Sequence, residues 1–545
     1  MLYVSCHCSA NWLEANQTAA LLVDASPQSA QKIPDKMFGI FSSYVYEINH
    51  AGAGGLWAEL VSNRGFEAGG QNTPSNIDPW SIIGNEMYII AGTDRTSCFS
   101  RNEIALRMEV LCDNGGSIIC PNGGVGIYNP GFWGMNIVQG KTYKLSMHVR
   151  SVDSVNLLVS LTKFRWITKL ADNYPSKSVI WFDQVSLMPL DTYKGHGFRK
   201  ELGSMLANLK PRFIRFPGPG HFGDVWRYWT DDGLGYFEFL SSMYLMLAED
   251  LGASPVWVIN NGISHNDQVD TSTILAFVQD ALDSIEFASG EADSKWGSVR
   301  ASMGHPEPFE LKYVALGNQD CWKKNYRAAY PDIQLISNCD GSGWQVGSSR
   351  NDMFAKAHQF ELRQHGLSTG PKAFVSEYAA TGQNVGTGNL FSALAQAGFL
   401  IGLEINSDVV EMASNAPLFV NDNDRRWNPD AIVFNSWQQY GTPTYWMQQF
   451  FKESSGAILH PASDIVNLKI TVAGLQNAVN SFGSTITVLT SKNLMDENSF
   501  KEPNKVVPLQ SKLQNAGENM DVVIAPHSFI SFDLALATTN YRSAI

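Results

Sequence analysis

The sequence lacks long hydrophobic runs, clusters of basic residues and the common metal- or nucleotide-binding motifs. No apolar stretch approaches the roughly 18 residues that a membrane-spanning helix needs, so we expect no membrane span. The 545-residue chain has a net charge of −13 and no run of Lys and Arg, which disfavours a nucleic-acid partner. Because no HExxH, paired CxxC or P-loop motif occurs, we expect no metal and no cofactor. These absences favour a neutral ligand.

Cysteine is also scarce, and its number, seven, is odd. Cys112 and Cys120 bracket a Gly-rich loop and are candidates for a disulfide, whereas the Cys6-His7-Cys8 run lacks the second half of a zinc site. The first ten residues have small residues but no basic segment or apolar core, and we interpret them as a signal peptide that has lost its front. The glycosylation sequon at Asn16 supports a secreted relative.

Length and patterning predict several domains, because 545 residues of ordinary globular composition exceed one domain. Residues 72–190 contain short β-like runs between Gly, Asn and Pro turns, which predicts a small β-sandwich. Strand and helix signals alternate over 191–453, which predicts parallel strands in a barrel. Over 454–545 the period returns to two, as in a second β-sandwich. Residues 1–35 are expected to be a leader with a strand, and 36–71 the first barrel segment.

The individual elements are expected where apolar runs stop at turns or polar residues. The expected barrel strands are 36–41, 212–216, 255–259, 311–316, 333–336 and 373–376, and apolar residues at three- and four-residue steps predict a helix over 274–285. The expected strands of the two sandwiches are 104–111, 141–149, 155–161, 178–182, 466–472, 485–489 and 522–524.

Two strand endings in the central region have the residue types of a carboxylate-pair site. The run 374–377 ends on Glu377, and the run 313–319 ends on an amide, Gln319, which lies 377 − 319 = 58 residues earlier. Residues at the C-terminal ends of barrel strands carry catalysis, and a retaining glycosidase places two carboxyl groups there about 5 Å apart. Glu377 fits the nucleophile of such an enzyme. The alternative is a strand-end glutamate that is paired with an arginine.

Gln319 does not fit the second role, because a carboxamide neither donates nor accepts a proton near neutral pH. A plain hydrogen-bonding residue is the alternative at this position. The adjacent Asp320 is a poor replacement acid, since successive residues at a strand end point in opposite directions.

Six segments of the chain resemble the plant-type α-L-arabinofuranosidases of glycoside hydrolase family 51. They are residues 47–52, 212–218, 220–226, 314–320, 374–378 and 421–429, and the resemblance extends over nearly the whole chain. It implies a (β/α)8 TIM-type barrel, an inserted β domain similar to a carbohydrate-binding module, and a C-terminal β-sandwich. It further implies exo-acting removal of terminal arabinofuranose from arabinan or arabinoxylan, with retention of configuration, in the cell wall or extracellular matrix.

The resemblance also implies roles for particular residues. The family nucleophile falls on Glu377 and the family acid/base on Gln319, with Asn318 as its companion. Arg215 is expected near the sugar, although a pair with a neighbouring carboxylate is an equal alternative, and Glu47 stands where relatives have paired glutamates. The charged run 421–427 either rims the site or is a solvated loop.

The chain departs from the family pattern at several separate positions. A sugar-contacting loop is shortened at Pro219, a His-bearing strand expected after Asp340 is missing, and residues 241–246 are additional. We interpret these changes as a misjoined gene model or a decaying gene copy. A catalytically impaired arabinan- or arabinoxylan-binding protein is therefore the second functional hypothesis. A third, a secreted structural protein, requires a closed barrel mouth.

Overall fold

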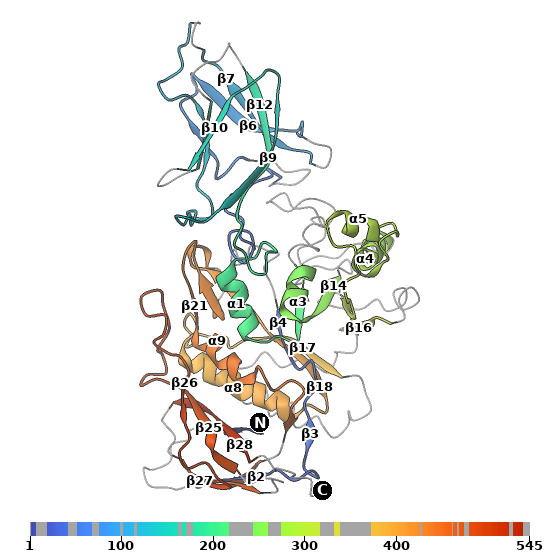
Figure 1. Ribbon diagram of the computed structural model, residues 1–545, viewed down its shortest axis with the longest axis vertical. Helices are drawn as coiled ribbons and strands as arrows, with labels where there is room; N and C mark the ends of the chain where they lie inside the picture. Colours follow the sequence, from blue (N-terminus) through green and yellow to red (C-terminus); the bar gives the residue numbers. More distant parts are fainter. Residues whose placement is uncertain are drawn as a thin grey trace, which may run out of the picture.

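The computed structural model describes most of the chain, in three stacked parts (Figure 1). The described residues are 2–6, 19–41, 52–67, 76–98, 102–113, 117–161, 166–170, 178–216, 244–259, 274–316, 332–337, 372–425, 428–459, 462–465, 468–473, 479–522 and 527–537. A β domain lies at one end of the molecule, a strand-and-helix barrel lies in the middle, and a second β domain lies at the other end.

The middle part contains a sheet in which the described strands are all parallel, in the order β16-β15-β14-β13-β4-β18-β17. Its strands are β4 (Phe38–Phe41), β13 (Phe213–Phe216), β14 (Ser254–Ile259), β15 (Tyr313–Leu316), β16 (Gln334–Ser337), β17 (Ala373–Tyr378) and β18 (Val410–Asn415). The strands β4, β13, β14, β15 and β16 lie in chain order, β17 lies beside β18, and β4 joins the two groups by pairing with β18. This is the strand order of a TIM-like barrel. Residues 338–371, between β16 and β17, lie outside the described part.

Helices cover the outside of this sheet and separate it from the second β domain (Figure 1). They are α1 (Lys200–Asn208), α3 (Met246–Leu251), α4 (Ile274–Ser289), α5 (Gly297–Ser302), α8 (Leu390–Ile405), α9 (Pro443–Gln448), η6 (Asp422–Asp424) and η7 (Gln449–Phe451). The Asn389 side chain caps α8 by accepting a hydrogen bond from Ser392 N at 2.9 Å. Among the described residues, no helix combines the length and apolarity needed to cross a membrane.

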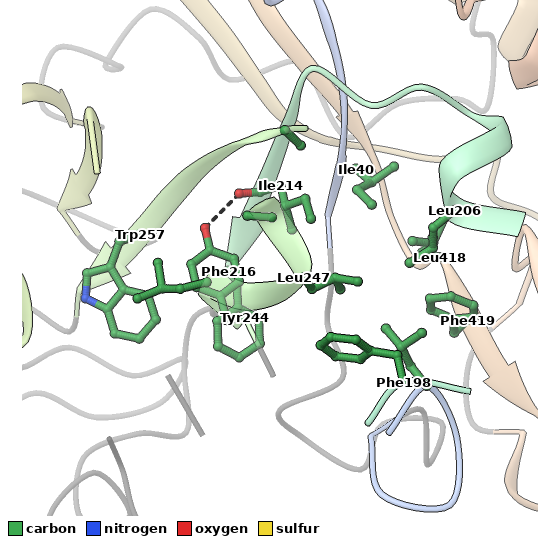
Figure 2. Packing of buried hydrophobic residues seen from close by; sticks show 14 of the residues in the cluster. Ile40, Phe198, Leu206, Ile214, Phe216, Tyr244, Leu247, Trp257, Leu418 and Phe419 are labelled. Carbon is green, nitrogen blue, oxygen red and sulfur yellow. Dashed lines mark hydrogen bonds between the residues drawn. The ribbon is translucent and has the colours of Figure 1, made fainter. Parts of the chain in front are cut away.

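Alternation along β13 separates the barrel interior from the helix-covered face. Ile214 and Phe216 pack outward with Tyr244 and Trp257, and the Tyr244 hydroxyl donates to Ile214 O at 2.8 Å (Figure 2). Phe213 faces inward, where the interior cluster also contains Val256, Val258, Ala315 and Met412. Because the strand period is two, the next inward residue after Phe213 is Arg215. The strand thus carries a buried arginine toward the C-terminal end of the barrel.

The first β domain consists of two four-stranded sheets, β10-β11-β8-β5 and β6-β7-β12-β9. Its strands are β5 (Ser81–Ile83), β6 (Ile89–Asp94), β7 (Ala105–Val110), β8 (Gly126–Asn129), β9 (Tyr143–Ser151), β10 (Leu157–Leu161), β11 (Trp166–Leu170) and β12 (Val179–Pro189). The Cys112–Cys120 disulfide forms as predicted. Buried Glu59 accepts hydrogen bonds from Val61 N and Leu187 N, so one carboxylate joins the segment after β4 to the end of β12.

The second β domain includes strands from both ends of the chain. Its main strands are β1 (Leu2–Cys6), β2 (Ala19–Asp24), β23 (Ala462–Ile465), β24 (Leu468–Ala473), β25 (Val479–Thr490), β26 (Leu509–Lys512), β27 (Asn519–Asp521) and β28 (Ser528–Leu536). Two smaller sheets occur elsewhere in the chain. One pairs β3 (Gln31–Lys32) with β22 (Ile458–Leu459), and the other has three strands, β19 (Phe419–Asn421), β20 (Ile432–Phe434) and β21 (Gln439–Gly441).

Residues 1–35, where a leader with a strand was expected, contribute two strands to this domain. Leu2–Cys6 pairs antiparallel with β28, and β2 pairs parallel with β24. A further strand was predicted over 522–524; residues 523 and 524 lie outside the described residues, and β27 ends at Asp521.

Buried Glu404 on α8 makes folding pH-dependent. Its Oε1 has no hydrogen-bond partner, and burial raises the pKa of the carboxyl to about 7, against about 4.3 for a free glutamate. Between these pH values the folded state holds a proton that the unfolded state has released. The stability that the folded protein gains from this bound proton is therefore complete below about pH 4.3 and is lost as pH rises through about 7.

We predict that Glu404→Gln flattens the pH dependence of stability. The neutral amide binds no proton, so up to about 1.4 kcal/mol per pH unit of the wild-type slope should disappear between about pH 4.3 and 7. Burial also raises the pKa of Asp183 to about 7, so part of the slope should remain. Urea unfolding across that range measures the effect, with exposed Glu502→Gln as the control. A variant slope equal to that of the wild type would contradict the assignment.

Candidate active site

Arg215 and Glu377 meet at the C-terminal end of the barrel. Arg215 Nη1 donates to Glu377 Oε1 at 2.6 Å, and these atoms form an ion pair. The arginine side chain is 2% exposed and the glutamate side chain is 41% exposed. The pair therefore has a buried cationic end and a partly exposed carboxylate end. Both alternatives raised for these residues, an arginine paired with a carboxylate and a glutamate paired with an arginine, are observed in the structure.

A β-bulge turns Glu377 toward the interior. Val375 and Tyr378 both pack in the cluster around α8, although residues three apart on a regular strand face opposite sides. The pairing of β17 with β18 explains this, because Ser376 and Glu377 together oppose the single residue Ser414. One extra residue in a strand shifts the alternation by one position. Without the bulge, Glu377 would lie on the face that packs against α8.

Several contacts hold the bulge and the arginine in place. Ser376 O accepts hydrogen bonds from Ser414 Oγ at 2.6 Å and from Arg215 Nη1 at 3.3 Å. The guanidinium also lies over the Phe41 ring, 4.5 Å from its centroid, at the end of β4. Two other strands, β4 and β17, thus fix Arg215 from different sides. The arginine in turn orients one oxygen of Glu377 through a charge-assisted hydrogen bond.

The residues behind the bulge are buried and mutually bonded. Asn415 Nδ2 donates to Tyr378 O at 3.1 Å and to Gln396 Oε1 at 3.0 Å. Burial raises the pKa of the Tyr378 hydroxyl far above its ordinary value, so this group remains neutral. These contacts connect β17 and β18 to α8, and they leave Glu377 as the exposed titratable group at the end of β17.

Of the residues that sequence reasoning placed in the site, the structure brings Arg215 and Glu377 together. Glu47, Asn318, Gln319 and Asp320 lie outside the described residues, and β15 is described to Leu316. Phe41, Ser414 and the backbone carbonyl of Ser376 also contribute to the site, and the sequence did not indicate them. Period-two alternation from Gly39 would have placed Phe41 inward, but no local pattern indicates the bulge that brings Ser376 and Ser414 together.

In the described part of the charged run 421–427, Arg425 Nη2 pairs with Asp422 at 3.0 Å, and Arg425 Nη1 donates to Asn428 Oδ1 at 3.0 Å. The Arg425 side chain is 15% exposed. Among the residues that the structure describes, no group of three or more His, Cys, Asp and Glu side chains is arranged to hold a metal ion.

We predict that Glu377→Ala destabilises the fold by about 1 to 2 kcal/mol, because it leaves a buried guanidinium without its carboxylate. Glu377→Gln keeps an acceptor for Arg215 and should cost less. Denaturant unfolding of both variants measures their order of stability. Ser376→Ala is the control, because it leaves the backbone carbonyl in place. An alanine variant as stable as the wild type would show that the pair contributes nothing to folding.

Two family models match the chain, the Alpha-L-arabinofuranosidase 1 domain over residues 219–366 and the Alpha-L-arabinofuranosidase C-terminal domain over residues 373–528. The second match includes Glu377 and the bulge. A solved structure of the arabinose-bound α-L-arabinofuranosidase MgGH51 superposes with a TM-score of 0.76 over 95% of this chain and 100% of that chain, at 24% identity. That structure therefore supports the fold.

Alpha-L-arabinofuranosidase 1 of Arabidopsis thaliana is 51% identical over 638 residues, which cover 96% of this chain and 92% of that protein. Alpha-L-arabinofuranosidase 2 of the same plant is 50% identical over 95% of this chain and 92% of its own length. An alignment of 638 positions exceeds the 545 residues of this chain by at least 638 − 545 = 93, so the relative contains internal segments that are absent here. The chain belongs to the plant-type α-L-arabinofuranosidases of glycoside hydrolase family 51.

Proposed function

We propose that the chain is an exo-acting, retaining α-L-arabinofuranosidase whose turnover is slowed by the amide at position 319. The observation that carries this proposal is the Glu377 carboxylate, held by Arg215 at the C-terminal end of a barrel strand. The proposed substrates are terminal non-reducing α-L-arabinofuranosyl residues of arabinan and arabinoxylan. The proposed location is the cell wall or extracellular matrix, and the first β domain would act there as a carbohydrate-binding module.

In the first step, Glu377 attacks the anomeric carbon of the sugar. Its Oε1 is bonded to Arg215, while Oε2 makes no hydrogen bond with the described residues and is the oxygen that we assign to attack. A bond forms between Oε2 and the anomeric carbon as the glycosidic bond breaks, and the electron pair leaves with the departing oxygen. Arg215 keeps the carboxylate plane fixed during this displacement, because its own position is set by Ser376 O and the Phe41 ring.

The second step hydrolyses the glycosyl-enzyme. Water attacks the anomeric carbon, the bond to Glu377 breaks, and the water proton must pass to a base. In the family this base, which also protonates the leaving group in the first step, falls on Gln319. An amide performs neither transfer. Both steps are therefore expected to lack proton transfer, while the nucleophile remains.

We predict that turnover of natural arabinan is roughly 10²- to 10⁴-fold slower than in a relative with glutamate at the position of Gln319. An aryl arabinofuranoside should be less affected in its first step, because a phenolate leaves without protonation. Azide should then accelerate turnover, since it attacks the glycosyl-enzyme without a base. Glu377→Ala is the control and should abolish all of this turnover. Full activity on arabinan would overturn the assignment of Gln319.

We predict that Gln319→Glu restores activity only in part. Two carboxyl groups in one pocket push their proton affinities apart, which gives the new acid a raised pKa. The internal segments that the Arabidopsis relative has and this chain lacks remain absent, however. A misplacement of about 1 Å in the pocket costs about 10²-fold. Steady-state kinetics of the variant with and without azide measure the rescue, and a rate equal to that of an intact relative would show those segments to be dispensable.

The second candidate function is a binding protein on the same scaffold, and the specific observation in its favour is the amide at position 319. Binding of arabinan without turnover distinguishes the binding protein from the enzyme. A protein that binds arabinan while Glu377→Ala leaves every measurable rate unchanged would support the binding protein and contradict the enzyme.

A further inference from the structure

Two exposed tryptophans lie on adjacent loops at the junction between the first β domain and the barrel. Trp133 is 49% exposed and lies between β8 and β9, whereas Trp437 is 62% exposed and lies in the turn between β20 and β21. The loops lie close together, because a Cβ atom added to Gly134 would lie 3.5 Å from Ser436 Oγ. Residues adjacent to the two tryptophans are thus neighbours in space, although the tryptophans are about three hundred positions apart in sequence.

The first loop holds Trp133 outward at a conformational cost. Trp133 has φ +55°, a left-handed conformation that disfavours bulky side chains by roughly 1 to 2 kcal/mol. The preceding Phe132 is 8% exposed, and its ring packs against Gly54, where a Cβ atom would lie 2.2 Å away. Phe132 therefore anchors the loop while the next side chain points to solvent. Folding alone favours glycine or asparagine at such a φ.

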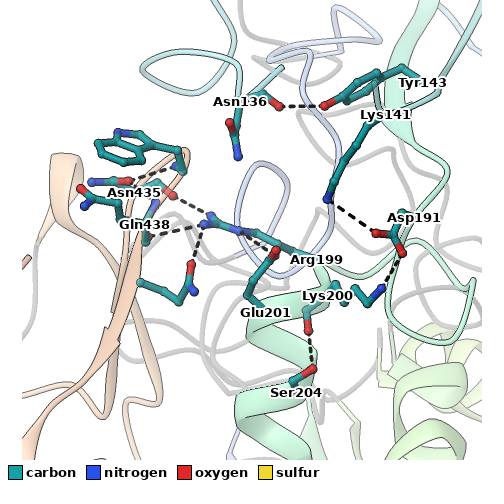
Figure 3. A network of polar contacts seen from close by, with 12 residues as sticks. Asn136, Lys141, Tyr143, Asp191, Arg199, Lys200, Glu201, Ser204, Asn435 and Gln438 are labelled. Carbon is teal, nitrogen blue, oxygen red and sulfur yellow. Dashed lines mark hydrogen bonds and ion pairs between the residues drawn. The ribbon is translucent and has the colours of Figure 1, made fainter. Parts of the chain in front are cut away.

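The second loop is a rigid turn. Asn435 Oδ1 accepts hydrogen bonds from Trp437 N at 3.0 Å and from Gln438 N at 2.7 Å. Arg199, just before α1, donates to Asn435 O at 2.6 Å and to Gln439 Oε1 at 3.1 Å. Figure 3 shows Arg199 reaching this turn, with Asn136 of the facing β-domain loop on the other side of the junction. The turn therefore presents its indole from a fixed backbone.

Both loops lie on the catalytic face of the barrel. The helix of a (β/α) unit runs antiparallel to its strands, so the start of α1, where Arg199 bonds to the turn, lies at the C-terminal ends of the strands. The other loop packs on Gly54 and on Leu60 O, in the segment that follows the C-terminal end of β4. Glu377 lies at the C-terminal end of β17. The two tryptophans and the proposed nucleophile thus share one face.

We propose that Trp133 and Trp437 form a platform that binds a neutral polysaccharide chain beyond the reacting arabinose. This inference rests on the proposed function, which supplies a polymer whose terminal unit must enter the barrel. Indole faces stack on the C–H faces of sugar rings, and aromatic groups with an apolar body and a polar edge suit partly wet sites. The net charge of −13 also fits a neutral ligand better than an anionic one. Exposed apolar side chains grouped beside a site mark ligand contacts.

The test measures binding of the full chain to soluble arabinan and arabinoxylan by affinity gel electrophoresis, which needs no turnover. The variants are Trp133→Asn, Trp437→Ala and the double variant. The matched control is Phe482→Ala, which removes an aromatic side chain that is 86% exposed on β25 of the other β domain. We expect each tryptophan variant to weaken polymer binding roughly tenfold, and the double variant further, while the control binds as the wild type does.

Two further readouts separate this role from a structural one. Trp133→Asn should keep or raise the thermal midpoint, because asparagine tolerates the left-handed conformation. The rate on a small aryl arabinofuranoside should not change, since that substrate does not extend beyond the barrel. Variants that bind the polymer like the wild type would overturn the platform while leaving the proposed function intact. A change of oligomeric state with unchanged polymer binding, or failure of the wild type to bind the polymers, would also overturn it.

Discussion

The ion pair between Arg215 and Glu377 is the contact on which the catalytic face depends, and it depends in turn on one extra residue in β17. The bulge opposite Ser414 reverses the alternation of the strand, so that Tyr378 packs with α8 while Glu377 faces the interior. Arg215 is 2% exposed and needs an anionic partner at that position. Register, burial and charge are therefore satisfied together when Glu377 points toward the arginine.

The same face carries the connection to the first β domain. Glu59, in the segment that follows β4, accepts hydrogen bonds from the backbone of both that segment and the end of β12. Arg199, at the start of α1, holds the turn between β20 and β21. The inserted domain is thus attached where the chain leaves one barrel strand and returns toward the next. Loops from both domains meet on the same face of the barrel as the proposed catalytic carboxylate.

Much of the barrel could be predicted from sequence, because each strand is a short apolar run that stops at a turn or polar residue. The expected run 255–259 falls within β14, and 212–216 differs from β13 by one residue. The bulge could not be predicted, since it is defined by pairing with β18 and not by a local pattern. The pairing of the edge strand β1 could not be predicted for a similar reason, because Leu2 pairs with Leu534, more than five hundred positions away.

The central claim is that Glu377, held by Arg215, is the nucleophile of a retaining enzyme that has lost its acid/base. Mass spectrometry of the intact protein after mixing with an aryl arabinofuranoside tests it directly. Without a base the glycosyl-enzyme should persist, so the account predicts a mass increase of one arabinofuranosyl residue that maps to the peptide containing Glu377. The adduct should be absent in Glu377→Ala. Release of the phenol with no adduct, or an adduct on another carboxylate, would contradict the claim.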